Sequence, residues 1–300
     1  MSRNNKINTI VKVSNLTKFY GRTKGIEKVS FEIHEGEIYG LMGPNGAGKT
    51  TTLRSMLNLI SSDSGKTNIL GKDVNELSSK EISHISYLPG EFEMYSNLTG
   101  KQYLTYISNL RNAKTNNIHL LSDQLDLDLN KKINALSKGN KQKIGIVQAF
   151  MNSPKLAILD EPTSGLDPLK QQEFQNIVKE QNKKGCSVLL SSHILNEIED
   201  LCEKVGIIKD GTLIASEQIS ALKNKTIKKY EVTFENPPSE NKLSEIKGIY
   251  DLKIKDEIAT FTIKGNIDDM IKTISKFTVI NLRILEPDLE EIFLTYYHKA

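Results

Sequence analysis

At residues 43–50 the chain reads Gly43-Pro44-Asn45-Gly46-Ala47-Gly48-Lys49-Thr50, and this stretch decides the fold. It follows an apolar run at residues 37–42 and opens a segment in which apolar residues recur at helical spacing. The stretch fits G-x-x-x-x-G-K-[ST], in which glycines let backbone N–H groups turn inward around a phosphate and the helix N-terminus adds a positive dipole end. Because both flanking segments have the required pattern, a phosphate-binding loop is favoured over a plain glycine-rich turn.

A second polar element lies roughly 110 residues further along, where the apolar run at residues 156–159 ends in Asp160 and Glu161. A buried strand in an open α/β sheet presents groups to a ligand at its carboxyl end. Lys49 is suited to the β and γ phosphates, Thr50 and Asp160 to Mg²⁺, and Glu161 to polarising an attacking water. Taken alone, the acids are better explained as a solvated strand end, but together with the phosphate loop they predict nucleotide hydrolysis.

The first two thirds of the chain alternate between short apolar runs and amphipathic helices, which is the pattern of a layered α/β domain. A helix is expected from Lys49 and another after Asn140, and a hairpin at Asp210-Gly211. Strands are expected at residues 10–13, 29–33, 37–42, 66–70, 85–88, 156–159, 187–191, 205–209 and 213–215.

The composition changes after residue 220, where the polar and basic sequence ALKNKTIKKY predicts a linker between domains at 8–220 and 226–300. Beyond it we expect a strand at 228–234, a helix at 241–247, a hairpin of alternating strands near 252–263, a helix at 267–274 and a strand at 279–285. This βαββαβ order predicts a small α+β domain of ferredoxin-like fold. A terminal helix carrying Leu289, Ile292, Phe293 and Tyr296 would complete it.

Composition narrows the class of protein. With 300 residues, 38% hydrophobic and 26% charged, the chain has ordinary globular usage, and 40 Lys+Arg against 37 Asp+Glu give a net charge of only +3. A nucleic-acid binder driven by bulk charge is therefore disfavoured. No run approaches about 18 apolar residues and no secretory signal is recognisable, so neither a membrane span nor secretion is expected. Cys186 and Cys202 fit no disulfide or zinc pattern.

Three further motifs complete a recognisable order: LSKGN at residues 136–140, PTSGLD at 162–167 and SSH at 191–193. With the phosphate loop and the LAILDE strand, this order resembles the nucleotide-binding domain of ATP-binding cassette (ABC) transporters over residues 8–220. The resemblance implies a P-loop fold with antiparallel β and helical subdomains, the helical one at about 96–150. It also implies ATP and Mg²⁺ as ligands and two domains stacked head to tail.

Individual residues take roles from this resemblance. Lys49, Glu161 and His193 would be catalytic, with His193 at the γ-phosphate, and Thr50 and Asp160 would hold the metal. Asp167 and Ser137 would lie at the dimer interface. The residues implied to bind nucleotide are Tyr20, stacking on adenine, then Gly43, Pro44, Asn45, Gly46, Ala47, Gly48, Lys49, Thr50 and Thr51, and, from the opposite subunit, Ser137 and Gly139.

Two positions depart from the family pattern. Asn140 stands where the signature normally ends in Gln, a mild change because the shorter amide still hydrogen-bonds. Gly90 stands where the family usually places a Gln that reaches Mg²⁺ and the attacking water. Glu91 is the polar side chain available next to it, and whether it replaces the Gln stays open.

The resemblance also implies a partner and a place in the cell. The helical subdomain would receive a separate transmembrane permease, which would hold this subunit at the cytoplasmic face of the membrane. The tail at residues 287–297 resembles that of bacterial drug and antibiotic-resistance exporter ATPases, which favours export. An importer ATPase, a non-hydrolysing regulatory cassette, and a soluble ABC ATPase acting on nucleic acid or ribosomes stay as alternatives. The C-terminal domain is expected to be an accessory or regulatory one.

Overall fold

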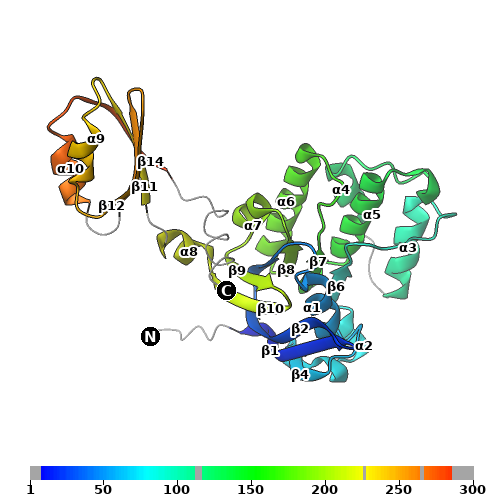
Figure 1. Ribbon diagram of the computed structural model, residues 1–300. Coiled ribbons are helices and arrows are strands. Elements are labelled where there is room, and N and C mark those ends of the chain that lie inside the picture. The colour runs from blue at the N-terminus through cyan, green and yellow to red at the C-terminus, as the bar shows by residue number, and fades with distance from the viewer. Residues whose placement is uncertain (1–7, 112–116, 226–227, 264–266, 286–300) are drawn as a thin grey trace, which may run out of the picture. The chain divides into compact units, whose positions relative to one another are not determined.

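The computed structural model describes residues 8–111, 117–225, 228–263 and 267–285 (Figure 1). The chain divides into two compact units, residues 1–219 and 220–300. Among the described residues, no helix is both long and apolar enough to cross a lipid bilayer.

The centre of the first unit is a six-stranded sheet of order β10-β9-β3-β8-β7-β6. Its strands β6, β7, β8, β3 and β9 run parallel, and β10 pairs antiparallel with β9. Strands β3, β7 and β8 are buried along their whole length, including Asp160 at the end of β7 and the serines at both ends of β8. The bounds are β3 Ile38–Met42, β6 Ile85–Leu88, β7 Leu156–Asp160, β8 Ser187–Ser192, β9 Lys204–Lys209 and β10 Thr212–Gln218.

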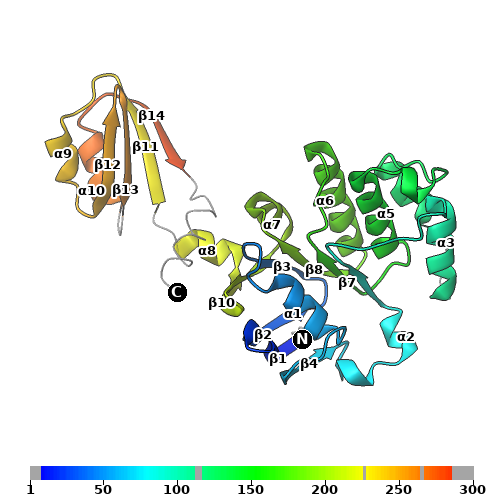
Figure 2. The ribbon, with the colours of Figure 1, turned by 45° about the vertical axis from the view of Figure 1, so that its right-hand side comes forward.

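Helices cover both faces of this sheet (Figure 2). Helix α1 (Lys49–Met56) packs on one face through Leu53 and Met56, and α6 (Pro168–Lys183) and α7 (Leu195–Leu201) pack on the other. Gly40 shows how closely α7 approaches, because a Cβ there would lie 2.8 Å from Ile198 Cδ1. The parallel strands therefore end between two helical layers, at the edge where α1 begins.

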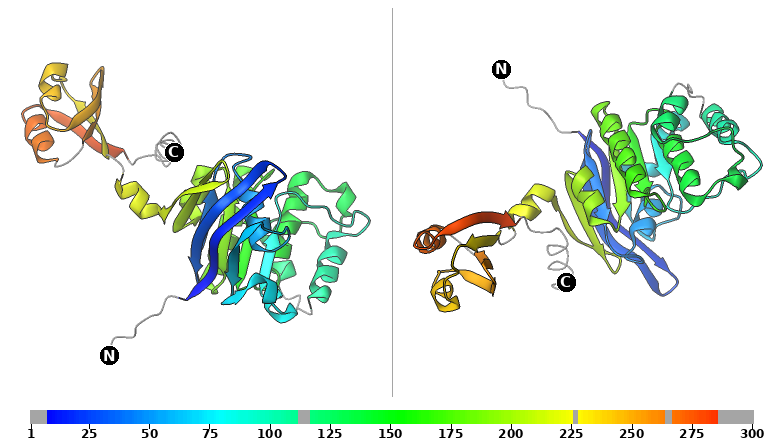
Figure 3. Two further views of the ribbon diagram at one scale, coloured as in Figure 1. Left: turned by 60° about the horizontal axis from the view of Figure 1, so that its bottom comes forward. Right: turned by 90° about the horizontal axis from the view of Figure 1, so that it is seen from above.

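A second, antiparallel sheet of order β2-β1-β4-β5 lies across the central strands (Figure 3). Its inward residues share one hydrophobic core with α1 and the central sheet. The bounds are β1 Thr9–Tyr20, β2 Thr23–His34, β4 Ser64–Ile69 and β5 Lys72–Asp73, followed by the short helices η1 Val74–Glu76 and α2 Ser79–Ile82. Helix α1 thus lies between two sheets, which fixes the loop that precedes it.

The helical part of the first unit contains α3 (Gly100–Leu110), α4 (Ile118–Gln124), the short η2 (Ile133–Ala135) and α5 (Lys138–Phe150). Thr99 starts α3 with a capping box, since its hydroxyl accepts from the Gln102 N–H and the Gln102 side chain accepts from the Thr99 N–H. The segment between α3 and α5 is not helical throughout. Asp126 has a positive φ of 49°, and Leu127 and Leu129 are buried without helical structure between α4 and η2.

The second unit is a four-stranded antiparallel sheet of order β12-β13-β11-β14 with two helices. One core holds both helices to the sheet, with Tyr230, Phe234 and Phe261 among its largest side chains. The elements are β11 Lys228–Phe234, α9 Glu240–Ser244, β12 Ile249–Lys255, β13 Ile258–Ile263, α10 Asp268–Ile274 and β14 Val279–Leu285.

The segment expected to be a linker contains helix α8 (Ile219–Lys225), and β11 begins only three residues after that helix ends. The expected terminal helix and the tail at 287–297 lie outside the described residues.

Candidate active site

The loop at residues 43–48 joins β3 to α1, and its backbone conformation requires glycine at two points. Gly46 and Gly48 have φ values of +81° and +107°, in the left-handed region that disfavours other residues. Gly48 is also the N-cap of α1, where a Cβ would lie 2.9 Å from Gly25 O. The loop is therefore confined between the N-terminus of α1 and the β1–β2 hairpin.

A cleft of about 350 Å³ opens above this loop. Tyr20, half exposed at the end of β1, and Glu161, directly after β7, both line it. The lining residues are Tyr20, Lys24, Gly25, Pro44, Asn45, Gly46, Gly48, Lys49, Thr50, Thr51 and Glu161. Eight of the residues expected to bind nucleotide are among them, while Gly43 and Ala47 support the loop from behind.

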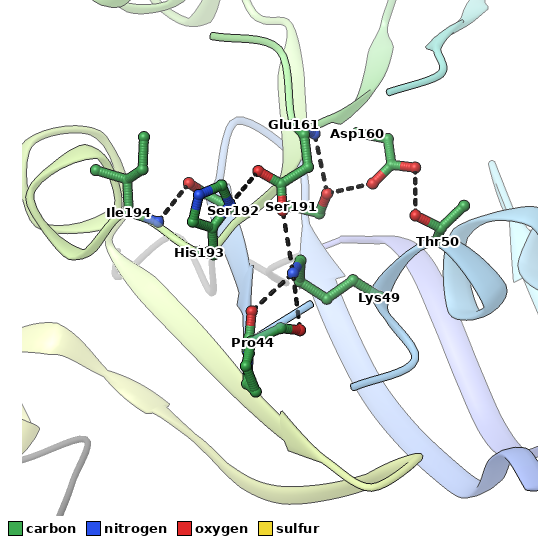
Figure 4. A network of polar contacts seen from close by, with 10 residues as sticks. Pro44, Lys49, Thr50, Asp160, Glu161, Ser191, Ser192, His193 and Ile194 are labelled. Carbon is green, nitrogen blue, oxygen red and sulfur yellow. Dashed lines mark hydrogen bonds and ion pairs between the residues drawn. The ribbon is translucent and has the colours of Figure 1, made fainter. Parts of the chain in front are cut away.

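Lys49 and Glu161, which line this cleft, form a chain of polar contacts with His193 (Figure 4). The Lys49 ammonium donates to the carbonyls of Gly43 at 2.7 Å and Pro44 at 3.2 Å, and lies 3.0 Å from Glu161 Oε1. Glu161 Oε2 lies 2.6 Å from His193 Nδ1. One carboxylate thus lies between the lysine of the loop and the histidine that follows β8.

Asp160 ends β7 beside them and is only 1% exposed. Its Oδ2 accepts from the Thr50 hydroxyl at 2.7 Å, and its Oδ1 accepts from the Ser191 hydroxyl. The Ser191 hydroxyl also accepts from the Glu161 N–H at 3.1 Å. A hydroxyl and a carboxylate of this kind are the hard oxygen donors that Mg²⁺ prefers, so Thr50 and Asp160 fit that ion.

Sheet topology explains why these residues meet. Strand β7 pairs in parallel with β8, so Asp160 lies opposite Ser191, and β8 pairs in parallel with β3, whose end begins the phosphate loop. Glu161 then turns away from the strand with a φ of +47°. The ends of three neighbouring strands therefore carry their polar residues to one edge of the sheet.

Gly90, at the end of β6, lies beside the same acids. A Cβ at Gly90 would lie 3.3 Å from Asp160 O and 3.7 Å from Asp160 Oδ2. Nearby Tyr87 is partly buried, and this burial raises the pKa of its phenol, with a smaller effect in the same direction from the charge of Asp160. Glu91 is exposed. The side chain missing at Gly90 would therefore have pointed at Asp160.

Comparison with known proteins shows the family of this chain. A family model described as ABC transporter matches residues 26–164. The bacitracin transport ATP-binding protein of Bacillus licheniformis is 37% identical over 238 residues, which are 75% of this chain and 75% of that protein. The chain belongs to the ABC transporter ATP-binding proteins. It is thus an ATPase subunit of this family, as its motifs predicted.

Two solved structures resemble this ABC ATPase. An ATP-binding subunit of an ABC transporter is 30% identical with a TM-score of 0.67, and the match covers 72% of this chain and 93% of that one. A dimeric ATP-binding cassette in a post-hydrolysis state with ADP and phosphate is 26% identical with a TM-score of 0.61, over 70% of this chain and 98% of that one.

Three residues that the family pattern assigns to the dimer do not line the ABC cleft of their own chain. Ser137 is exposed and caps α5, its hydroxyl accepting from the Asn140 N–H at 3.3 Å. Gly139 follows in the first turn, where a Cβ would lie 2.8 Å from Gly165 O. Asp167 is exposed and caps α6 through the Lys170 N–H at 3.0 Å.

Some site residues were missed by reading the sequence. Lys24 and Gly25 line the cleft because the β1–β2 hairpin folds over the loop, and Ser191 joins both acids because β8 lies next to β7. Gln142 holds α5 to the segment after the acids, since its Nε2 donates to Pro162 O at 2.8 Å. The one available signal was the position of Ser191 at the end of an apolar strand, directly before the SH pair.

Proposed function

We propose that this ABC subunit hydrolyses ATP with Mg²⁺ as a head-to-tail homodimer and powers export through a separate permease. The observation that carries the hydrolytic role is the position of the Glu161 carboxylate between Lys49 and His193, in the lining of a cleft shared with the phosphate loop. A carboxylate held there can accept the proton of a water as that water's oxygen bonds to the γ-phosphorus and the bond to ADP breaks.

The other site residues would position the nucleotide. Tyr20 would stack on the adenine, and the loop N–H groups with Lys49 would hold the phosphates, an interaction that competes with the contacts Lys49 makes to carbonyls and to Glu161. His193 would donate to the γ-phosphate. Thr50 and Asp160 would hold Mg²⁺, which when bound neutralises charge that develops on the β and γ phosphates.

The dimer is proposed from the exposure of groups suited to a phosphate. Ser137 and the backbone of Gly139 lie at the N-terminus of the 13-residue helix α5, outside the cleft of their own chain. A helix N-terminus favours an anion, and the Ser137 hydroxyl, which accepts from the Asn140 N–H, can still donate its own proton to one. We place them against the γ-phosphate bound by a second copy, with Asp167 at the same interface.

A surface for the permease is proposed on the helical part of the ABC unit. Residues Met94 to Leu98 and Tyr106 of α3 line a cavity of about 630 Å³, and Tyr95 and Tyr106 meet there edge to face with ring centres 5.7 Å apart. Both rings are more than 40% exposed. Exposed aromatic rings around a hollow suit an apolar helix of a partner protein. The subunit would thereby be held at the cytoplasmic face of the membrane.

The proposal that the transport is export has two supports. One is the relative named for bacitracin transport, and the other is the sequence at residues 287–297, which resembles the tail of exporter ATPases. For residues 226–300 we propose a ferredoxin-like accessory domain, because β11 and β12 are joined through α9, β13 and β14 through α10, and the strand order is β12-β13-β11-β14. A supporting role fits better than a catalytic one, since the cleft residues all precede this domain.

Hydrolysis is tested with Glu161→Gln and, as a matched control, Glu76→Gln at an exposed acid of η1 that does not line the cleft. Glu161→Gln should keep ATP affinity, because the phosphate loop is untouched, and lose about 10²- to 10⁴-fold in phosphate release, the usual effect of removing a general base. Glu76→Gln should behave as wild type. Wild-type turnover by Glu161→Gln would contradict the assignment.

The dimer and the permease surface need separate measurements. ATP-loaded Glu161→Gln should scatter light as a dimer, and adding Ser137→Arg should return it to a monomer. A membrane protein encoded beside this gene should co-purify with the subunit in detergent. Tyr106→Glu should weaken that capture while Tyr250→Glu, at an equally exposed tyrosine of the second unit, should not.

A further inference from the structure

Helix α7 buries an acidic side chain directly behind the active site. Glu197 is 4% exposed, and neither of its carboxyl oxygens has a hydrogen-bond partner of good geometry in the part of the chain that the structure describes. Burying a carboxyl whose hydrogen bonds are not fully made is costly, and natural proteins rarely keep such a group without a use for it. No role in nucleotide or metal binding accounts for it, because Glu197 does not line the cleft.

The surroundings of Glu197 come from two segments. The hydroxyls of Ser192 and Thr163 approach its carboxyl, and the charges of Glu161 and His193 act on it from the site. From the helix side, it faces the buried thiol of Cys202. Burial raises the pKa of Glu197 to about 7, Glu161 adds to the rise, and the two hydroxyls and His193 oppose it.

Each of the two hydroxyls belongs to a segment that carries a site residue. Ser192 directly precedes His193 and its Oγ accepts from the Ile194 N–H at 2.9 Å, which shapes the turn after β8. Thr163 is buried two residues after Glu161, and its carbonyl accepts from the Leu166 N–H at 3.0 Å. A single carboxyl therefore lies between the histidine turn and the segment that follows Glu161.

We propose that Glu197 is a positioning residue for ATP hydrolysis: it joins Ser192 to Thr163 and so holds His193 at its 2.6 Å contact with Glu161. The inference rests on the proposed roles of Glu161 and His193. A neutral carboxyl can donate to one hydroxyl and accept from the other. Once ionised, the carboxylate can only accept, repels Glu161 and competes with it for His193, so loss of this proton should slow turnover.

The test compares three full-length variants. Glu197→Gln keeps a donor and an acceptor, and Glu197→Leu keeps the approximate volume without either. Asp200→Asn removes an exposed charge on the same helix as Glu197, where Asp200 Oδ2 accepts from Gln175 Nε2 of α6. Binding of ATP and the turnover number are measured from pH 6 to pH 8, with circular dichroism as the check on folding.

All three variants should bind ATP within about 2-fold of wild type, since the cleft is unchanged. Glu197→Leu should lose about 10-fold or more in turnover number. The ratio of turnover by Glu197→Gln to turnover by wild type should rise by about 3-fold or more between pH 6 and pH 8, because the amide does not ionise. Asp200→Asn should show neither effect.

Two results would overturn the proposal: wild-type turnover by Glu197→Leu, or a Glu197→Gln to wild-type ratio that stays constant with pH. If Glu197 only stabilised the fold, its replacement would lower stability without changing the pH dependence of that ratio. If Glu197→Leu does not fold, the pH dependence of the Glu197→Gln to wild-type ratio tests the proposal by itself. If Glu161→Gln turns over ATP as fast as wild type, the proposed function itself is wrong. If Glu161→Gln is slow but the Glu197 variants turn over like wild type at every pH, only this inference is wrong.

Discussion

Replacing Ser191 with alanine tests the link between the two acids. The Ser191 hydroxyl donates to Asp160 Oδ1, a carboxylate oxygen on a side chain that is 1% exposed. After Ser191→Ala this oxygen loses a charge-assisted hydrogen bond where water cannot replace it, which costs about 1.5–3 kcal/mol. The Glu161 N–H keeps a partner, because it also donates to the Ser191 carbonyl at 3.1 Å. The expected loss therefore comes from the Asp160 contact.

Ser187→Ala is the matched control on the same strand. Ser187 is as deeply buried, but its hydroxyl accepts from a neutral partner, the Gly36 N–H, at 2.8 Å. Its loss should cost only about 0.5–1.5 kcal/mol. Both changes are measured as the free energy of unfolding in urea, followed by circular dichroism. A Ser191→Ala variant no less stable than Ser187→Ala would refute the reasoning.

Four further outcomes are expected. Tyr20→Ala should weaken ATP binding by roughly 10-fold, the loss of one base–aromatic stack, while Tyr20→Phe should not, as equilibrium binding will show. Gly139→Ala should destabilise the fold by about 1–3 kcal/mol in urea, because its Cβ would lie 2.8 Å from Gly165 O. Glu197 has a folded-state pKa of about 7 against an ordinary 4.5, so the native state holds its proton longer and stability falls as pH rises between these values. Relative to Glu197→Gln, wild type should lose about 3 kcal/mol of unfolding free energy from pH 4 to pH 8. A chain ending at Leu222 should still bind ATP with wild-type affinity, and a truncated protein that is folded by circular dichroism but does not bind ATP would contradict this.

Some strands were predicted with their bounds and others only in part: strands were expected at 10–13 and 29–33, but β1 runs over Thr9–Tyr20 and β2 over Thr23–His34. Strands β6, β11 and β14 have the expected bounds, because β-branched residues leave little choice of conformation there. Segments governed by tertiary contacts were not predictable. The polar residues of α8 predicted a linker, and the non-helical path at 125–132 depends on burying Leu127 and Leu129.

The same distinction applies to the site. The phosphate loop is formed by eight consecutive residues, so its motif can be recognised without any tertiary information. The acids at the end of β7 follow from the pattern of one strand. The contacts that join them could not be read from the sequence. The Lys49–Glu161 ion pair and the Ser191 bridge depend on which strands are neighbours, and that order is set by the whole sheet.

The contacts at the start of α5 have a consequence for coupling between two ATP sites. Gly139 packs against Gly165, and Gln142 holds Pro162, so the helix start and the segment carrying Asp167 are joined within one chain. In the proposed dimer, the start of α5 of one copy touches the nucleotide in the cleft of the second copy. Release of phosphate from that cleft would therefore shift the segment that follows Glu161 in the first copy. The two clefts would then be coupled, so that occupancy of one changes the affinity of the other for ATP.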